Sequence, residues 1–211
     1  LALGFLLTER VIVSADQVVR IRHCNVVPDP DAEDNVIQVT LREGVTVDYE
    51  RLRRNLYASS SCGVCGKATL ANVLATAPPL DLQLTVSAQV LYRLPERLRE
   101  AQAMFDVTGG LHGAGLFDRD GGLLAVREDV GRHNAVDKVI GWAVRQGMGL
   151  IEPRLLMISG RASFEIVQKA AAARIPVVAA VSAPSSLAVA LAESVGITLI
   201  GFLRGQGMNV Y

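Results

Sequence analysis

The segment from Leu155 to Phe202 alternates short apolar runs with amphipathic stretches, and it restricts the possible fold more than any other part of the chain. Strands that are apolar at nearly every position are buried on both faces, as in a parallel sheet covered by helices on either side. Because each run is followed by a stretch with helical periodicity, the sequence predicts an α/β fold. The expected strands and helices are, in order, Leu155–Ser159, Ser163–Ala173, Val177–Val181, Ser185–Val195 and Thr198–Phe202.

The chain before this segment changes character twice, which predicts three parts. Residues 1–60 mix alternating and polar stretches and are expected to form a small N-terminal α+β lobe. Residues 61–86 show no clear periodicity and are expected to form a loop and a linker. From residue 87 the α/β domain begins, and we expect it to extend to residue 211.

Further elements are expected outside the alternating segment. The pattern of apolar and polar residues predicts strands at 18–25 and 35–41. Proline favours the first turn of a helix, so we expect one helix to begin at Ala88 and a second to begin at Pro95 and reach about Phe105. Two paired strands and one amphipathic helix are expected at Gly113–Phe117, Gly122–Arg127 and Arg132–Gln146.

The composition argues against two classes of partner. Lys and Arg together number 21, as do Asp and Glu, so the formal net charge is zero and no general attraction to nucleic acid or anionic membranes is expected. The most apolar region is broken by Pro176 and Pro184, so no transmembrane helix is predicted.

The apolar start, Leu1–Leu7, has no basic leader or cleavage site, so we expect a helix that begins upstream rather than a signal peptide. We therefore expect a cytoplasmic protein.

Cys62 and Cys65 form a CxxC motif between small residues, in a chain that contains three cysteines. In a reducing compartment this spacing serves half a zinc site, a redox dithiol or a thiol that carries sulfur. Zinc needs four ligands, and the chain has no second CxxC; a zinc deaminase is excluded because the Glu and Pro of its signature are missing. A thioredoxin-type dithiol begins a helix directly after a strand, whereas Cys62 follows a serine-rich stretch. A sulfur carrier fits a glycine-flanked loop in which Lys67 favours the thiolate.

Polar segments follow each of the three predicted parallel strands. Because ligands of open α/β sheets bind beyond the carboxyl ends of the strands, we expect these segments to meet at one edge of the sheet. Helix starts, serine hydroxyls and the guanidinium groups of Arg161 and Arg204 would suit a phosphate-bearing ligand there. The alternative is that Ser163 and Ser185 are ordinary helix caps and that the arginines are surface charges.

Two further polar clusters keep a structural and a functional interpretation. The glycine-rich stretch Asp106–Gly115 contains His112 and predicts either a tight turn or a close approach of the backbone to a ligand. The stretch Glu128–Lys138 carries more polar groups around a helix start than capping requires. Within it, His133 is equally suited to a helix-start contact and to acid–base chemistry.

Taken together, the motifs of this chain resemble those of the FdhD family, the sulfur-carrier accessory proteins of formate dehydrogenase. The resemblance extends from Leu3 to Tyr211. It is carried by Ser61–Gly66, Thr108–Ala114, Glu128–Lys138, Ser159–Glu165 and Val181–Ala188.

The resemblance implies a sulfurtransferase that forms a cysteine persulfide. In this family a cysteine desulfurase loads sulfur onto the CxxC loop, and the protein passes it to the molybdenum bis(molybdopterin guanine dinucleotide) cofactor of formate dehydrogenase. By resemblance, Cys62 carries the persulfide and Cys65 assists. The cofactor-binding stretch corresponds to Phe202, Leu203, Arg204, Gly205, Gln206 and Gly207.

The resemblance also implies an architecture. The larger domain is expected to be a cytidine-deaminase-like three-layer structure, with helices on both faces of the sheet and no zinc site of its own. The proteins of the family are expected to form homodimers. The alternative function is a non-catalytic nucleotide-binding module in which the CxxC motif holds a shared structural zinc.

Overall fold

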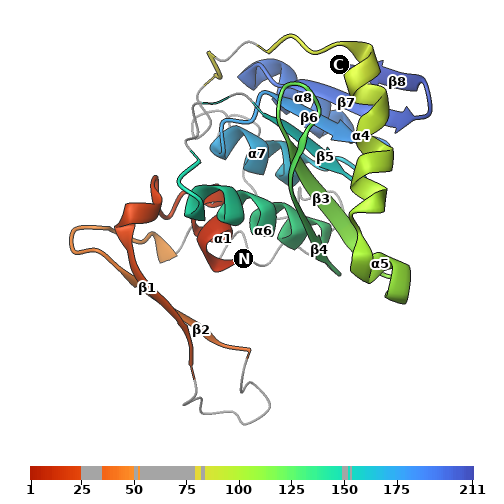
Figure 1. The fold of residues 1–211 in the computed structure, drawn as a ribbon. Coiled ribbons are helices and arrows are strands. Elements are labelled where there is room, and N and C mark those ends of the chain that lie inside the picture. The colour runs from red at the N-terminus through yellow and green to blue at the C-terminus, as the bar shows by residue number, and fades with distance from the viewer. Residues whose placement is uncertain (25–34, 50–51, 53–78, 82–83, 149–151, 153) are drawn as a thin grey trace.

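Six strands form the central sheet of the protein in a computed structural model (Figure 1). The structure describes residues 1–24, 35–49, 52, 79–81, 84–148, 152 and 154–211. Cys62 and Cys65 therefore lie outside the described residues, as do residues 61–78 and 82–83 of the predicted 61–86 segment. The predicted division of the chain into three parts stays a prediction.

The sheet has the strand order β4-β3-β5-β6-β7-β8. Its three inner strands β5, β6 and β7 are parallel, whereas β3 runs antiparallel to both β4 and β5, and β8 runs antiparallel to β7. The parallel prediction is therefore right for the centre of the sheet, and the flanking strands make the sheet mixed. The bounds are β3 His112–Phe117, β4 Leu123–Asp129, β5 Leu155–Ile158, β6 Val177–Ala180, β7 Thr198–Arg204 and β8 Gly207–Val210.

Helices cover both faces of the sheet, which confirms the expected three-layer α/β architecture. On one face α6 (Arg132–Arg145), α7 (Phe164–Ala172) and α8 (Ser186–Val195) share a core with alternate strand residues such as Leu156 and Ile158. On the other face α4 (Ala88–Glu100) packs on the intervening residues, among them Leu155 and Met157. Figure 1 shows α4 and α6 on opposite sides of the sheet. The two-residue period of each strand thus divides its side chains between two cores.

The prediction that a second helix begins at Pro95 is wrong. Ser87 caps a single helix by accepting a hydrogen bond from the Val90 N–H, and α4 continues through Pro95 to Glu100. Leu91, Leu94 and Leu98 are buried along one face of α4 on either side of the proline. This shared apolar face keeps the helix continuous even though Pro95 cannot donate a backbone hydrogen bond. The short helix α5 (Ala103–Thr108) follows separately.

The N-terminal part of the chain contributes one helix to the main body and one hairpin beside it. Helix α1 (Ala2–Thr8) packs on α6 and α7, and Leu7 belongs to the core beneath them. After the single turn η1 (Ala15–Gln17), strands β1 (Val18–His23) and β2 (Ile37–Leu41) form an antiparallel hairpin. Figure 1 shows this hairpin extending away from the six-stranded sheet. Among the described residues, no helix combines the length and the apolar character that crossing a membrane requires.

Candidate functional site

The segments that follow β5 and β6 lie side by side, and the last residues of β7 lie beside them at one edge of the sheet. The Ala162 N–H donates to the Ala183 carbonyl at 3.2 Å, and the Ser185 N–H donates back to the Ala162 carbonyl at 3.0 Å. At the next strand, the Phe202 N–H donates to the Ser182 carbonyl at 3.2 Å. Main-chain hydrogen bonds therefore fix the relative positions of these two segments and of the end of β7, which together we call the strand-end edge.

The predicted cofactor-binding stretch, Phe202 to Gly207, adopts a different local structure from the one expected. Strand β7 does not end at Phe202 but continues to Arg204, where it pairs with Gly207 of β8 across a turn. An irregularity in the pairing between Gly201 and Arg204 accompanies a positive φ of 55° at Phe202. The stretch is thus the tip of a hairpin, with Gly205 at φ 54° in the turn.

The hairpin tip carries an exposed aromatic side chain and an arginine that contacts the end of β6. Phe202 is 45% exposed although it is aromatic and adopts the left-handed backbone region that disfavours large residues. Backbone strain of this kind is found most often where a side chain must be held for binding or catalysis. Arg204 lies across the end of β6, because its Nε donates to the Val181 carbonyl at 3.0 Å. Both therefore belong to the strand-end edge.

The two predicted helix-capping serines behave differently. Ser185 is an ordinary cap, since its hydroxyl accepts a hydrogen bond from the Ala188 N–H at 3.2 Å. Ser163 is 5% exposed and makes no such bond to α7. Its Oγ lies 2.9 Å from His133 Nε2, and the same nitrogen is 3.7 Å from a carboxylate oxygen of Glu165. The capping interpretation therefore holds for Ser185 but does not account for Ser163.

Two more polar side chains, those of His112 and Arg132, lie next to Gly160 at the same edge. A methyl group at Gly160 would lie 3.2 Å from His112 Nδ1 and 3.9 Å from Arg132 Cδ. Partial burial and the neighbouring positive charge of Arg161 lower the pKa of Arg132, whereas Glu165 opposes this. Residues from the start of β3, the start of α6 and the β5–α7 connection thus surround one glycine. The sequence indicated each residue but could not indicate that β3 pairs with β5.

Most polar residues of the Glu128–Lys138 stretch have structural partners. The Glu128 carboxylate accepts hydrogen bonds from the Met104 and Phe105 N–H groups at the start of α5. Asp129 accepts from the Gly131 N–H and pairs with Lys138. Although partial burial acts in the opposite direction, the hydrogen bonds from Lys138 and Gly131 hold the pKa of Asp129 below its usual value.

Arg132 and His133 are the members of this stretch that reach the strand-end edge. The glycine-rich stretch before β3 likewise contains both a structural residue and a residue at the strand-end edge. Gly109 ends α5 with a φ of 64°, which fits the tight-turn interpretation, and His112 then opens β3 beside Gly160.

Sequence reasoning missed a buried ionic cluster, which we call the Lys169 cluster. The Lys169 ammonium donates to both carboxylate oxygens of Asp137 at 2.9 Å, to Glu9 at 3.2 Å and to the Thr8 hydroxyl at 3.0 Å. Burial raises the pKa of Asp137, while Lys169 and Thr8 act in the opposite direction. The cluster joins α1, α6 and α7. The available signal was an Asp and a Lys at apolar-face positions of two helices.

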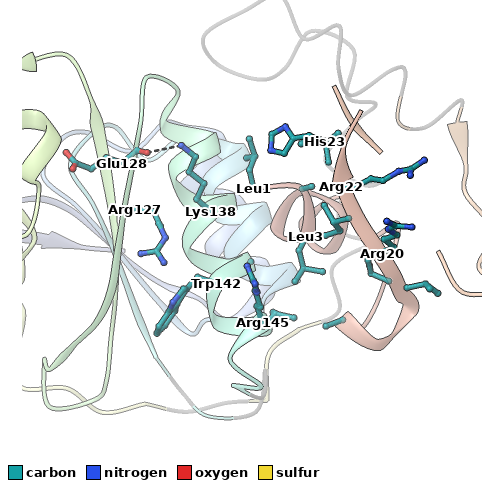
Figure 2. A pocket seen from close by; sticks show the side chains of 18 residues that line it. Leu1, Leu3, Arg20, Arg22, His23, Arg127, Glu128, Lys138, Trp142 and Arg145 are labelled. Carbon is teal, nitrogen blue, oxygen red and sulfur yellow. Dashed lines mark hydrogen bonds between the residues drawn. The ribbon is translucent and has the colours of Figure 1, made fainter. Parts of the chain in front are cut away.

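A groove of about 900 Å³ separates β1 from α6. Figure 2 shows His23 pointing from β1 toward α6, with Arg127, Lys138 and Arg145 on the opposite side. Lys138 donates to the Glu128 carbonyl, and the Arg127 guanidinium lies 5.7 Å from the centre of the Trp142 ring. None of the segments of the strand-end edge lines this groove.

Within the described part of the chain, no group of three or more His, Cys, Asp or Glu side chains is arranged to hold a metal ion. Cys62 and Cys65 are outside that part, so their assigned roles stay predictions, and so does the role of the Phe202–Gly207 stretch as a cofactor site.

Comparison with known proteins gives a consistent result. The chain is 53% identical over 214 residues to the sulfur carrier protein FdhD of Mycolicibacterium paratuberculosis, covering 100% of this chain and 79% of the relative. It is 51% identical to the protein of that name from Streptomyces avermitilis, covering 100% of this chain and 76% of the relative.

Among solved structures, a crystal structure of a putative formate dehydrogenase accessory protein from Desulfotalea psychrophila matches with a TM-score of 0.70 and 26% identity. The match covers 99% of this chain and 74% of that one. The model of the FdhD/NarQ family matches residues 1–211, the whole of the chain. The protein therefore belongs to the FdhD/NarQ family.

Proposed function

We propose that this protein is a sulfur carrier required for formate dehydrogenase activity. The observation that carries the proposal is the 53% identity, over the whole chain, to a relative named as a sulfur carrier protein. The CxxC motif supplies the thiol chemistry that such a carrier requires. In this proposal a cysteine desulfurase provides the sulfur and the molybdenum bis(molybdopterin guanine dinucleotide) cofactor receives it.

The sulfur is carried as a persulfide on Cys62. The Cys62 thiolate attacks the terminal sulfur of the desulfurase persulfide, a new S–S bond forms on Cys62, and the desulfurase thiolate leaves. Attack by the Cys65 thiolate on the Cys62 sulfur then releases the outer sulfur as hydrosulfide and leaves a Cys62–Cys65 disulfide. Each of the two steps breaks one sulfur–sulfur bond and forms another, so neither step requires an external oxidant. Reduction of that disulfide by a cellular dithiol restores the carrier.

The strand-end edge is the proposed binding site for the cofactor, which is bound as the substrate of the transfer. The tip of the β7–β8 hairpin supports this because it presents an exposed aromatic ring at Phe202 beside the guanidinium of Arg204. An aromatic ring stacks on a purine base, and a guanidinium group pairs with phosphate. We also propose that the protein acts in the cytoplasm, where thiols stay reduced, and that it functions as a homodimer.

Mass spectrometry of the protein after incubation with a cysteine desulfurase and cysteine tests the carrier role. We expect the mass of one added sulfur atom on the peptide that contains Cys62. The adduct should disappear in Cys62→Ala and persist in Cys24→Ala, the matched control at the remaining cysteine of the chain. An adduct that is absent from the wild-type protein would contradict the proposal.

Guanine-nucleotide binding tests the other half of the function. Arg204→Ala should weaken the affinity for GDP about tenfold, because one charge-assisted hydrogen bond is lost. Cys62→Ala should bind GDP like the wild-type protein, since the carrier thiol and the nucleotide site are separate in this proposal. Unchanged affinity in Arg204→Ala would remove the hairpin tip from the site. Stoichiometric zinc in the purified protein would instead favour a nucleotide-binding module with a structural metal.

A further inference from the structure

The groove between β1 and α6 is strongly basic although the chain as a whole is neutral. Lys and Arg together number 21 in the whole chain, as do Asp and Glu, whereas five Lys and Arg side chains line this groove against one carboxylate, that of Glu128. The basic side chains come from three elements: Arg20 and Arg22 from β1, Arg127 from β4, and Lys138 and Arg145 from α6. The fold therefore concentrates positive charge on both walls of the groove (Figure 2).

Little of this charge is neutralised by the described residues. Among them, Lys138 is the one member of the five that has a carboxylate partner, Asp129. The Glu128 carboxylate is already engaged, since it accepts hydrogen bonds from two N–H groups at the start of α5. Arg20 and Arg145 are exposed, and no described carboxylate pairs with either. A ligand that brings carboxylates into the groove therefore meets guanidinium groups that have no counter-charge in the described part of the chain.

The groove also gives access to an open edge of β1. All six residues of β1, Val18–His23, line the groove, whereas β2 contributes Ile37. Because successive side chains of a strand point to opposite faces, this lining includes main-chain groups as well as the side chains of one face. Strand β1 pairs with β2 along one edge, and no described segment pairs with its other edge. An edge of this kind presents N–H and C=O groups that pair with a further strand.

Apolar side chains complete the groove. Val19, Ile21 and Ile37 of the hairpin are exposed, and Leu3 of α1 and Trp142 of α6 lie in the lining. A two-stranded hairpin is marginally stable in water by itself, and a third strand stabilises it. The groove thus offers an added strand both apolar contacts and positive charge.

We propose that this groove binds an extended acidic segment of a partner protein, which adds to the open edge of β1 as a third strand. In strand addition the main-chain hydrogen bonds provide affinity, and the alternating side chains provide selectivity. Arg20 and Arg22 lie on one face of β1, while Arg127 and Arg145 lie across the groove. Acidic side chains on either face of the added strand therefore meet a guanidinium group. The inference does not depend on the sulfur-carrier function.

Two other occupants match the groove less well. A second copy of the chain that paired through β1 would bring Arg20 and Arg22 against the same arginines, and like charges on neighbouring strands repel. The phosphates of a nucleic acid would pair with the arginines, but they cannot donate to the carbonyl groups at the edge of β1. An acidic peptide meets the charged, the apolar and the main-chain groups together.

Fluorescence of Trp142, the single tryptophan of the chain, tests the proposal because this residue lines the groove. The probe is a synthetic peptide in which glutamate alternates with valine over the length of β1. We expect a saturable change in fluorescence, with an affinity that falls as salt is added. The double variant Arg20→Gln/Arg145→Gln should weaken binding about tenfold. Arg93→Gln/Arg119→Gln is the matched control, since it removes two exposed arginines that do not line the groove.

Two altered peptides separate charge from strand pairing. A peptide with lysine in place of glutamate should not bind. A glutamate peptide with methyl groups on the main-chain nitrogens that would face β1 keeps its charge but loses its donors, and it should bind about tenfold more weakly or worse. Equal binding of the methylated peptide overturns the strand addition.

The remaining outcomes decide the groove itself. Absence of binding of the glutamate peptide, by fluorescence and by calorimetry, overturns the proposal, and so do equal affinities of the two double variants. A single-stranded oligonucleotide of the same charge that binds as tightly as the peptide overturns the assignment to a protein segment. A protein that sediments as a smaller species once the peptide is bound indicates that the edge of β1 joins two copies of the chain, which also contradicts the proposal.

Discussion

Lys169 occupies a position of α7 that is otherwise filled by apolar residues, and its side chain is 5% exposed. A buried ammonium group is tolerated where its hydrogen bonds are satisfied and a counter-charge lies beside it. Here Asp137 and Glu9 supply the charge, and the Thr8 hydroxyl completes the set. One side chain therefore links three helices through charge rather than through apolar contact.

Lys169→Met should lower the free energy of unfolding by about 3–5 kcal/mol, because it leaves the buried Asp137 carboxylate without its counter-charge. Lys138→Met is the matched control, since its ion pair with Asp129 is partly exposed and should contribute about 1 kcal/mol or less. Urea denaturation followed by circular dichroism measures both. Equal, small effects would show that the Lys169 cluster contributes little to stability.

The same variant should show a stronger dependence on pH. Burial raises the pKa of Asp137, and Lys169 limits that rise, so removing Lys169 should raise the pKa further. A carboxyl group with a raised pKa in the folded state contributes stability below the unfolded pKa and loses it as pH rises through the folded pKa. The deficit of Lys169→Met relative to wild type should therefore be smaller at mildly acidic than at neutral pH. A pH-independent deficit in urea titrations would contradict this.

At the scale of elements, α6 and α7 end in the same hydrogen-bonding pattern with different residues at the left-handed position. In α7 the Arg174 N–H donates to Ala171 and the Ile175 N–H donates to Ala170, which is a Schellman motif. Arg174 has a φ of 54°. In α6 the equivalent position is Gly147, with a φ of 69°. Glycine adopts this conformation without the steric cost that a side chain incurs.

Arg174→Gly should therefore raise the free energy of unfolding by about 0.5–1 kcal/mol, although it removes an exposed ion pair with Asp81. Gly147→Ala should lower it by about 1 kcal/mol for the converse reason. Thermal denaturation of the two variants is the measurement. A destabilised Arg174→Gly protein would mean that the contacts of the arginine outweigh the backbone strain.

The sequence predicts an element best where the local pattern of apolar residues agrees with the burial of that element in the structure. The apolar runs from Leu155 onward are strands within a residue or two of their predicted bounds, because each run is buried on both faces. The break at Pro95 was mispredicted because burial along one face of α4 outweighs the local preference of proline. The extension of β7 past Phe202 depends on pairing with β8, which is formed by a later segment.

The candidate site was predictable to the extent that it follows from parallel strands. The meeting of the segments after β5 and β6 with the end of β7 is a consequence of the shared direction of the three strands, which the sequence indicated. The positions of His112 and Arg132 depend on the antiparallel pairing of β3 with β5 and on the packing of α6. These are long-range contacts, for which no local pattern in the sequence is a sufficient signal.

At the scale of the molecule, α1 is attached to the outside of the helical layer by an unusually close contact. A methyl group at Gly4 would lie 1.8 Å from the Asp137 carbonyl oxygen, and one at Gly141 would lie 2.7 Å from the Gly4 nitrogen. The backbones of α1 and α6 therefore touch, which brings Thr8 and Glu9 to the Lys169 cluster. Apolar packing, a close backbone contact and buried charged groups thus all hold α1 against α6 and α7.

Gly4→Ala should destabilise the protein by about 2 kcal/mol or more, because α1 must move away from α6 to admit the methyl group. Gly110→Ala is the control, since the nearest atom to its added methyl group is 3.8 Å away, and it should change stability by less than about 0.5 kcal/mol. Hydrogen exchange should show the greatest loss of protection in α1. Unchanged protection there would contradict the role of the close contact.

The strand-end edge is held together by main-chain hydrogen bonds that link the segments after β5 and β6 to each other and to Phe202 of β7. Amide and carbonyl groups are the same whichever amino acids carry them. The backbone conformation of the edge is therefore largely independent of the side chains that it carries. Substitutions there change the chemical character of the surface and leave the backbone in place. Arg161, Phe202 and Arg204 are accordingly positions at which an exchange of side chains would change the surface of the edge while its backbone stays in place.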